Sequence, residues 1–350
     1  MKRGLDEDRG AAEPKPKRKR ATREQPLDLT GFEGDVNTLK DLIRLAHFIK
    51  DHKKSRRKQK TGVMTLVDCI EELEDLDSMV GLDELKDDIT RQIMFFTLGL
   101  NGKEMMHTVI SGPPGMGKTT SIEKMAAIYA KMGFLSIGHV VSATRGDLVD
   151  QYLGGTAIKT GIVLEASKGG VLLIDEAYSL GDEGGRDSFS KECINTINQF
   201  LSENPENFMC IIAGYEKELK KNFFGANPGL ERRFQWWFRL KPYSLTDLVR
   251  ILQHQTQTQE WKLAEDVTAE WLAEQLRDGV ESGMFSNNGG DTMILFDKCK
   301  VCHSKRVFLD SQSERRRLTR KDITDGHALF KVYKNKHKRG MSESMRHMYC

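Results

Sequence analysis

The residues most able to do chemistry form the run GPPGMGKT, which fits the pattern G-x-x-x-x-G-K-S/T. In such a run the glycines let the backbone turn tightly, so that N–H groups and the start of the next helix face phosphate oxygens. The lysine reaches the β- and γ-phosphates, and the threonine hydroxyl is a ligand for Mg²⁺. We therefore predict that ATP and Mg²⁺ bind here, through Gly112, Pro113, Pro114, Gly115, Met116, Gly117, Lys118, Thr119 and Thr120.

A second motif, GGVLLIDEAYSL, places Asp175 and Glu176 directly after four apolar residues. A buried strand that ends in two adjacent carboxylates is costly unless a cation or a substrate uses them. We expect Asp175 to bind Mg²⁺ and Glu176 to polarise the attacking water. An apolar run before Asp-Glu is common in proteins. We assign it this role because the phosphate-binding run lies upstream in the same chain.

Both motifs need a rigid scaffold, and the pattern between about residues 77 and 242 predicts one. Short apolar runs alternate there with helical stretches, which is typical of a parallel sheet covered by helices. The phosphate-binding run follows one predicted strand and opens a helical stretch, as its chemistry requires. The five predicted strands cover residues 107–111, 139–143, 170–175, 208–214 and 234–240. Trp236, Trp237 and Phe238 fall inside the last strand, where we expect sheet packing.

The predicted fold class is α/β, a P-loop NTPase core with a five-stranded parallel sheet followed by a small all-α lid domain. Asp35 is expected to cap the first helix, and capping-box patterns at Ser244 and Thr319 predict helices of the lid. The predicted segments are a disordered basic tail (1–30), a helical segment (31–76), the core (77–242), the lid (243–334) and a C-terminal tail (335–350).

Charge is distributed unevenly along the chain. The 350 residues have a formal net charge of +3, yet residues 1–60 alone hold 18 Lys/Arg and 10 Asp/Glu. The basic residues concentrate in PKPKRKR (14–20) and KKSRRKQK (53–60). A basic cluster flanked by proline is typical of a nuclear-import signal, and it can also bind nucleic-acid phosphates. We favour import, because residues 1–31 contain no aromatic side chain that could stack on bases.

Membrane and secreted classes are not expected. No stretch of the sequence approaches the roughly 20 apolar residues that cross a bilayer, and MKRGLDEDRG lacks the apolar part of a secretion signal. We expect an intracellular protein, in the nucleus or otherwise the cytoplasm, with reduced cysteines. The run CKVCH (299–303) fits a haem-attachment pattern, but we expect neither haem nor zinc there, because its cysteines fall three apart on a predicted helix and lack a second ligand pair.

The motifs occur in order with four further stretches: SMVGLDELK, GFLSIGHVVSATRGDLVDQYLGGTAIKT, IIAGY and ANPGLERRF. Together they resemble the AAA+ ATPases, in the branch that holds red-type rubisco activase and stage V sporulation protein K. The resemblance covers about residues 77–242. It implies an ATP-hydrolysing homo-oligomeric ring, usually a hexamer, that remodels a macromolecular client, most often a protein.

The resemblance also implies roles for residues around the nucleotide. Val80 and Gly81 would flank the adenine. Gly214 and Tyr215 would stand where most AAA+ proteins have a polar sensor pair. The lid departs from the pattern, because residues 285–300 contain no arginine where the family usually supplies a second sensor.

Two further roles follow from the resemblance. Tyr152, in QYLGG, would be the aromatic pore-loop residue that grips a polypeptide, whereas a buried tyrosine is the alternative. Arg233, in ERRF, would be the arginine finger that reaches the γ-phosphate bound by the neighbouring subunit, with Arg232 as the second choice. An always-charged bidentate donor suits the charge that develops on that phosphate.

Two other classes of function stay open. A nucleic-acid-dependent motor or loader is favoured by the basic N-terminus and by LDSQSERRRLTRK near the lid. A P-loop kinase would transfer phosphate to a small acceptor, but the adjacent carboxylates and the ERRF run argue against it. Stimulation of ATP hydrolysis by DNA or RNA would support the first class, and a phosphorylated acceptor would support the second.

Overall fold

A computed structural model describes most of the chain after residue 30. The described residues are 31–52, 62–100, 106–152, 154–181, 187–308 and 315–347, without the side chains of 228 and 337–347. The predicted basic tail and both basic clusters, 14–20 and 53–60, lie outside them. Among the described residues no helix is long and apolar enough to cross a membrane.

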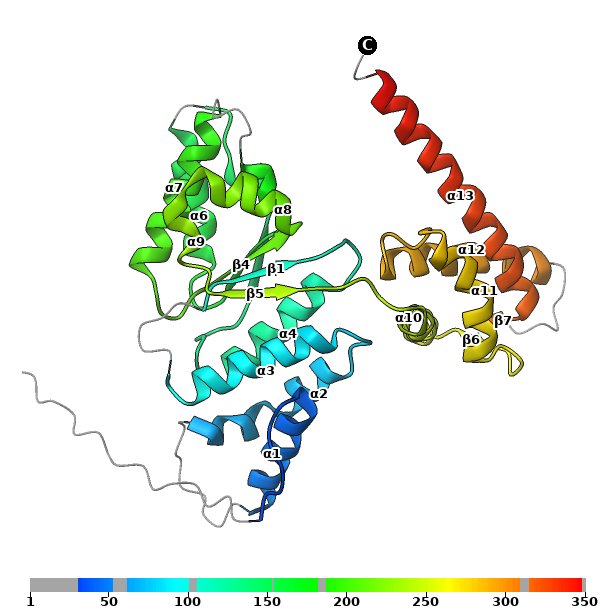
Figure 1. Cartoon of the computed structure of the whole chain (residues 1–350), viewed down its shortest axis with the longest axis horizontal. Helices are drawn as coiled ribbons and strands as arrows, with labels where there is room; N and C mark the ends of the chain where they lie inside the picture. Colours follow the sequence, from blue (N-terminus) through cyan, green and yellow to red (C-terminus); the bar gives the residue numbers. More distant parts are fainter. Residues whose placement is uncertain are drawn as a thin grey trace, which may run out of the picture. The chain divides into compact units, whose positions relative to one another are not determined.

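A sheet of five parallel strands forms the centre of the core, in the order β2-β3-β4-β1-β5 (Figure 1). All five strands were predicted, and each lies inside its predicted range. Their bounds are β1 Thr108–Ser111, β2 Val140–Ala143, β3 Val171–Ile174, β4 Met209–Gly214 and β5 Trp236–Arg239. Because the strands are parallel, the loops after β1, β3 and β4 leave the sheet at the same edge.

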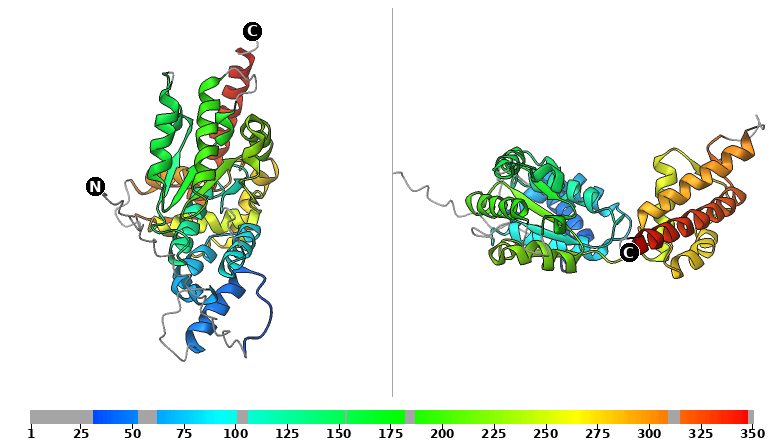
Figure 2. Two further views of the ribbon diagram at one scale, coloured as in Figure 1. Left: turned by 90° about the vertical axis from the view of Figure 1, so that its left-hand side faces the viewer. Right: turned by 90° about the horizontal axis from the view of Figure 1, so that it is seen from above.

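Helices cover both faces of this sheet. One face carries α3 (Asp83–Thr97) and α4 (Lys118–Lys131), and the other carries α6 (Gly155–Ala166) and α7 (Ser188–Glu203) (Figure 1, Figure 2). Right-handed crossovers between parallel strands produce this arrangement. The chain runs outward from β1 to β2 through α4, and returns from β2 to β4 through α6 and α7.

The strand side chains alternate between the two faces. Leu172, Ile174 and Ile212 share one buried cluster with residues of α6 and α7. Trp237 packs against the same cluster, and its indole Nε1 donates a hydrogen bond to the carbonyl of Phe234 (2.9 Å). The expectation that the tryptophans of β5 pack within the sheet is confirmed.

Short elements connect the strands and precede the lid. α5 (Arg145–Leu148) follows β2, and η2 (Ala177–Leu180) follows β3. Between β4 and β5 the chain forms α8 (Glu216–Glu218), a π-helical turn η3 (Leu219–Phe223), η4 (Phe224–Ala226) and α9 (Pro228–Glu231).

The helical segment before the core contains α1 (Leu39–His52), η1 (Gly62–Cys69) and α2 (Ile70–Asp77). The prediction that Asp35 caps the first helix is wrong. Thr38 caps it: its hydroxyl accepts a hydrogen bond from the N–H of Asp41 (3.3 Å), and the Asp41 carboxylate accepts from the N–H of Thr38 (3.0 Å). This reciprocal pair satisfies two N–H groups at the helix start, which Asp35 lies too far upstream to reach.

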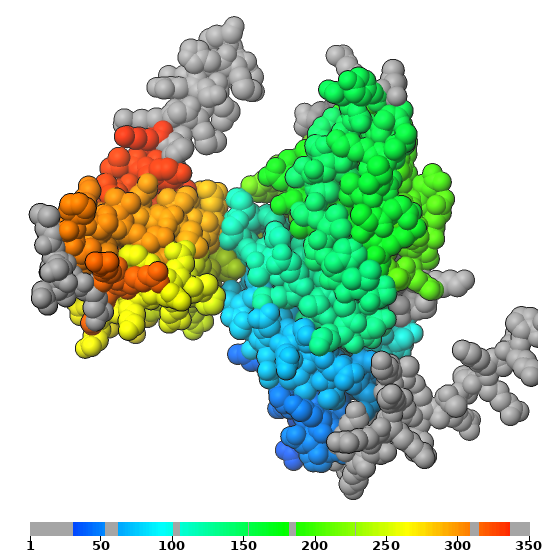
Figure 3. Space-filling view, turned by 180° about the vertical axis from the view of Figure 1, so that it is seen from behind, coloured from blue at the N-terminus to red at the C-terminus, as the bar shows by residue number. Residues whose placement is uncertain are grey.

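The same segment is fixed to the core through α2. Asp75 pairs with Lys124, and Glu72 pairs with Lys131 at 3.4 Å, both lysines lying on α4. α1 also contacts α3, and the blue N-terminal helices lie directly against the core surface in Figure 3. α4, the helix that follows the phosphate-binding loop, is therefore fixed by residues that precede the predicted start of the core at residue 77.

The lid contains the predicted helices and a short strand pair. β5 ends at Arg239, and α10 begins after Ser244, whose predicted capping box with Asp247 is present. The helices are α10 Leu245–Thr258, α11 Ala269–Glu281, α12 Gly289–Val307 and α13 Arg320–His347. β6 (Lys262–Leu263) pairs in parallel with β7 (Arg317–Leu318), an addition to the predicted all-α lid. The boundary predicted at residue 334 falls inside α13.

Candidate nucleotide site

The phosphate-binding run is a tight loop between β1 and α4. The helix begins at Lys118, so residues Gly112 to Gly117 make the whole turn. Gly115 shows why glycine is needed: its φ is 71°, and a Cβ there would lie 1.9 Å from the carbonyl oxygen of Asn287. No side chain fits in that space, and glycine alone adopts this backbone conformation at no steric cost.

The loop lines a cleft of about 270 Å³ that also collects the predicted carboxylates. The cleft is lined by Gly112, Pro114, Gly115, Met116, Gly117, Lys118, Thr119, Thr120, Asp175, Glu176, Tyr178, Gly214 and Tyr215. Pro113 is the predicted loop residue that does not line it. Segments that are far apart in the sequence therefore meet at one edge of the sheet, as the two motifs predict.

Lys118 lies over the loop it follows. Its Nζ donates hydrogen bonds to the carbonyl oxygens of Gly112 and Pro113, at 3.0 Å in both cases. Burial lowers the pKa of Lys118, and the negative charges of Asp175 and Glu176 oppose that shift. The ammonium group and the two carboxylates thus lie in one cleft, and their opposite charges attract each other.

Asp175 and Glu176 follow β3 in unlike surroundings. Asp175 is half-buried, and its Oδ1 accepts a hydrogen bond from the N–H of Glu176 (2.9 Å). Glu176 is exposed and has φ 49° and ψ 40°, a left-handed conformation that non-glycine residues seldom adopt. Such strain persists where the surroundings enforce it, and it turns the Glu176 side chain toward the cleft instead of along the strand.

Two tyrosines form the remaining wall. The rings of Tyr178 and Tyr215 have their centroids 6.0 Å apart, and Tyr215 is 43% exposed. Burial, the charge of Glu176 and a hydrogen bond with it raise the pKa of Tyr178. The sequence prediction missed Tyr178, although its place two residues after the carboxylate pair was a usable signal, because a 3₁₀ turn there returns the side chain toward Glu176.

The segment predicted to flank the adenine lies beside the cleft, not in its lining. Gly81 lines a second, smaller pocket of about 160 Å³ together with Tyr243 and Asp247. Val80 lines neither of these two pockets. The preceding residue, Met79, accepts a weak hydrogen bond from the Ser121 hydroxyl at its sulfur (3.7 Å), so the segment contacts α4.

Arg233 lies at the opposite edge of the sheet from the phosphate-binding loop. It precedes β5, whose first residue, Trp236, stands beside Thr108 at the start of β1. Its Nε donates a hydrogen bond to Oδ1 of Asn198 on α7 (3.0 Å). The loop follows the far end of β1, and Arg233 is not among the residues that line the cleft.

Tyr152 is exposed, so the alternative of a buried tyrosine is excluded. Its side chain is 70% exposed, and its N–H donates a hydrogen bond to Oδ1 of Asp150 (3.1 Å). Gly154 has φ 79° and no atom within 4 Å of the place of a Cβ. An aromatic side chain is therefore presented outward on the turn between α5 and α6.

The lid reaches the phosphate-binding loop through two residues that the sequence prediction did not include. Asn288 is 2% exposed, and its Nδ2 donates a hydrogen bond to the carbonyl of Pro114 (3.2 Å). The hydroxyl of Tyr243 donates to the carbonyl of Met116 (3.1 Å). The Asn-Gly pair in SNNGG was a signal for a turn, but nothing in the sequence indicated what that turn contacts.

The CKVCH run belongs to the packing of the lid. Cys299 is buried in the lid core, and burial raises the pKa of its thiol. The ring of His303 is hydrogen-bonded to the Asp322 carboxylate (3.3 Å) and to the carbonyl of Arg315 (3.0 Å). Within the described part of the chain no group of three or more His, Cys, Asp or Glu residues could hold a metal ion.

The fold and cleft define the class of P-loop nucleotide-binding proteins, and comparison with known proteins narrows it. Residues 108–226 match the ATPase family associated with various cellular activities (AAA). The chain is 36% identical to stage V sporulation protein K of Bacillus subtilis over 68% of this chain and 76% of that protein. It is 35% identical to chloroplastic ribulose bisphosphate carboxylase/oxygenase activase of Cyanidioschyzon merolae, over 71% and 81% respectively. The chain belongs to the AAA ATPase family, in the branch with these two proteins.

A viral relative and a solved structure add to this placement. A CfxQ-like protein of Acanthamoeba polyphaga mimivirus is 37% identical over 75% of this chain, and the match spans 64% of the viral protein's length. The crystal structure of the FIGL-1 AAA domain in complex with ADP superposes with a TM-score of 0.53 over 72% of this chain and 83% of that one, at 17% identity. That likeness concerns the fold alone. The predicted fold class and family resemblance are both confirmed.

Proposed function

We propose that the chain binds ATP with Mg²⁺ in the cleft, hydrolyses it, and uses the cycle to remodel a protein client within an oligomeric ring. The observation that carries this proposal is the meeting of the phosphate-binding loop, Asp175 and Glu176 in one cleft, while Arg233 stands at the opposite edge of the sheet. That separation supports a site completed by a second subunit.

Each group of the cleft has a chemical task. The loop N–H groups and Lys118 bind the phosphates. The hydroxyl of Thr119 and the carboxylate of Asp175 line the same cleft, and hard oxygen donors of this kind suit Mg²⁺. The bound ion would neutralise charge on the phosphates. Glu176 orients and polarises the attacking water, and its exposed position beside Asp175 leaves it free to do so.

The proposed ring and its client depend on two residues that lie outside the cleft lining, Arg233 and Tyr152. Arg233 supplies positive charge to the γ-phosphate held by its neighbour, so hydrolysis requires an oligomer, which we propose to be a hexamer. Tyr152, exposed beside a glycine that leaves its turn free to move, contacts an extended polypeptide in the centre of the ring. The relatives named for rubisco activation and for sporulation support this branch of remodelling proteins without identifying the client.

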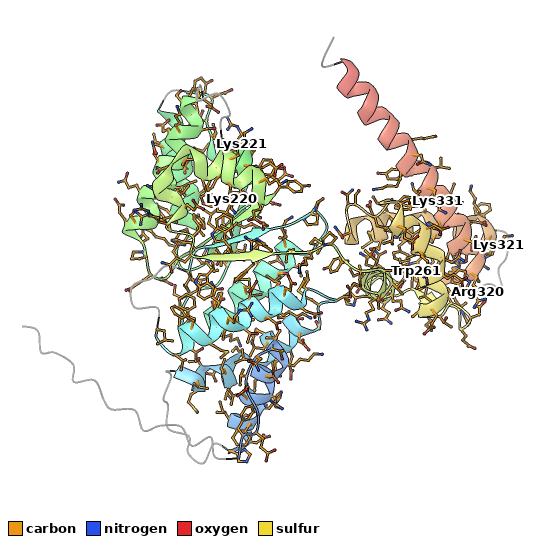
Figure 4. All side chains as sticks on the ribbon, in the orientation of Figure 1. Lys220, Lys221, Trp261, Arg320, Lys321 and Lys331 are labelled. Atoms are coloured by element: carbon orange, nitrogen blue, oxygen red, sulfur yellow. The ribbon has the colours of Figure 1, made fainter. Side chains whose placement is uncertain are left out.

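Nucleic acid is the second candidate client, favoured by the basic N-terminal clusters. Within the described lid, however, three arginines of the run LDSQSERRRLTRK are paired with carboxylates: Arg316 with Glu260, Arg317 with Glu265, and Arg320 with Asp266. Figure 4 shows Arg320 and Lys321 on the lid and Lys220 and Lys221 on the core. Paired arginines offer less charge to phosphates, so we favour a protein client. The nuclear-import signal stays a prediction, since it lies outside the described residues.

The test is capture of the client by an inactive variant. Glu176→Gln removes the carboxylate that polarises water and keeps the side-chain size, so ATP binding should persist while hydrolysis falls by about 10²-fold or more. Lys118→Ala, the matched control, should lose ATP binding. Recovery of polypeptide with Glu176→Gln in ATP, but not with Lys118→Ala, supports the proposal, and recovery of DNA or RNA selects the second candidate. Normal ATP hydrolysis by Glu176→Gln would refute the role of Glu176.

A further inference from the structure

The lid binds the phosphate-binding loop through three consecutive carbonyl groups of that loop. The carbonyl of Gly115 accepts a hydrogen bond from the N–H of Gly289, the first residue of α12, at 3.0 Å. Its two neighbours accept from side chains of the lid. The three pairs are Pro114 with Asn288 Nδ2, Gly115 with the Gly289 N–H, and Met116 with the Tyr243 hydroxyl.

Asn288 organises this contact. Its Oδ1 accepts a hydrogen bond from the N–H of Tyr243 (3.1 Å), so one amide group joins the strand-to-lid connection, the start of α12 and the loop. The residue has φ 50° and ψ −120°, which non-glycine residues seldom adopt. A buried amide in a strained backbone is costly unless its hydrogen bonds compensate.

The lid contacts the carbonyl side of the phosphate-binding loop, whereas a phosphate binds the N–H side. Each peptide group joins one carbonyl to the N–H of the next residue, so the three carbonyls belong to the peptides that present the N–H groups of Gly115, Met116 and Gly117. Phosphates bind N–H groups and not carbonyls. A peptide whose N–H is hydrogen-bonded becomes a better acceptor at its oxygen, so phosphate on one side of the loop strengthens the lid contact on the other.

We propose that Asn288 is a positioning residue that couples closure of the lid to nucleotide binding. It lies in the lid segment, residues 285–300, that contains no arginine where the AAA+ family usually supplies a second sensor. The proposal rests on ATP binding at the proposed site. Coupling is reciprocal: nucleotide stabilises the docked lid, and the docked lid raises nucleotide affinity. Asn288 acts by binding a carbonyl group of the loop, and it brings no charged group to the phosphate.

The test compares ADP binding by two variants and a control. Asn288→Gly permits the same backbone conformation and removes the side-chain hydrogen bonds to Tyr243, Pro114 and, within its own turn, Ser286. Asn288→Asp keeps an acceptor for the Tyr243 N–H but cannot donate to Pro114 when ionised. Asn287→Ala, at the exposed neighbouring position, is the matched control. Isothermal titration calorimetry should show ADP affinity lowered about fivefold or more in both Asn288 variants and unchanged in the control.

Hydrogen exchange distinguishes coupling from a purely structural role of Asn288, because it measures how the contact between lid and loop responds to ADP. In the wild-type protein, ADP should slow exchange of the Gly289 amide, and this response should be lost in Asn288→Gly and Asn288→Asp. If the variants bind ADP as tightly as the wild type and keep the ADP-dependent protection, the inference is wrong. If the wild-type protein itself does not bind ADP, the proposed function fails instead.

Discussion

Glu176 and Arg233, the residues proposed to act on the attacking water and on the γ-phosphate, are each held by a local hydrogen bond. The motif places Glu176 after a buried strand, but its left-handed backbone depends on η2, where the N–H of Ser179 bonds back to the Glu176 carbonyl (2.8 Å). The resemblance gives Arg233 a role, but only the sheet register shows that its own phosphate-binding loop lies past the far end of β1. The two groups proposed to act at one phosphate therefore lie at opposite edges of the sheet of a single chain.

The role of Arg233 leads to a prediction with a matched control. Arg233→Ala should lower the rate of ATP hydrolysis by about 10³-fold or more, the range of arginine fingers, and leave nucleotide affinity unchanged. Arg232→Ala, at the adjacent exposed position, should retain most activity. Steady-state ATPase assays and nucleotide titration measure both. If Arg232→Ala is the inactive variant, the finger has been assigned to the wrong residue.

At the scale of elements, α5, which precedes the turn that bears Tyr152, is linked to η2, which follows Glu176. Arg145, at the start of α5, donates a hydrogen bond from Nη1 to the carbonyl of Ser179 in η2 (3.0 Å) and pairs with Asp187 at the start of α7 (2.5 Å). The segment after β2 and the segment after β3 therefore share one guanidinium group. A shift of η2 would therefore act on α5, the helix that leads into the Tyr152 turn.

The exposed aromatic ring of Tyr152 should matter only when a client is present. Tyr152→Ala should keep basal ATP hydrolysis and lose its stimulation by an unfolded polypeptide, because the cleft lies on other elements. Tyr152→Phe should keep the stimulation, since the ring remains. ATPase rates measured with and without an unfolded polypeptide test this. Full stimulation of Tyr152→Ala would show that the client is gripped elsewhere.

The elements also show what the sequence could and could not predict. The five strands were found because each is a short, mostly apolar run between helical stretches, although only β1, β3 and β4 are buried along their whole length. β6 and β7 were missed because two residues carry no periodicity, and they pair only through the fold of the lid. The contact of Asn288 with Pro114 joins residues 174 positions apart, and no local pattern specifies such a contact.

At the scale of the whole molecule, buried histidines should make stability depend on pH. Burial lowers the pKa of His107 to about 3 and that of His327 to about 4, against 6.5 in the unfolded chain. The unfolded chain therefore binds more protons below pH 6.5, so stability is complete above that pH and falls on acidification. Urea unfolding between pH 7.5 and about 5, above the titration of most carboxylates, should show this loss. A flat profile would contradict it.

The proposed ATP hydrolysis depends on sites completed between subunits, because Arg233 and the phosphate-binding loop of the same chain lie at opposite edges of one sheet. The most direct measurement mixes two inactive variants. Lys118→Ala cannot bind ATP but has an intact Arg233, and Arg233→Ala binds ATP but lacks the finger. ATP hydrolysis should be restored in the mixture, where Lys118→Ala subunits supply Arg233 to neighbouring Arg233→Ala subunits. A mixture of subunits that exchange freely yet remain as inactive as the separate variants would contradict the account.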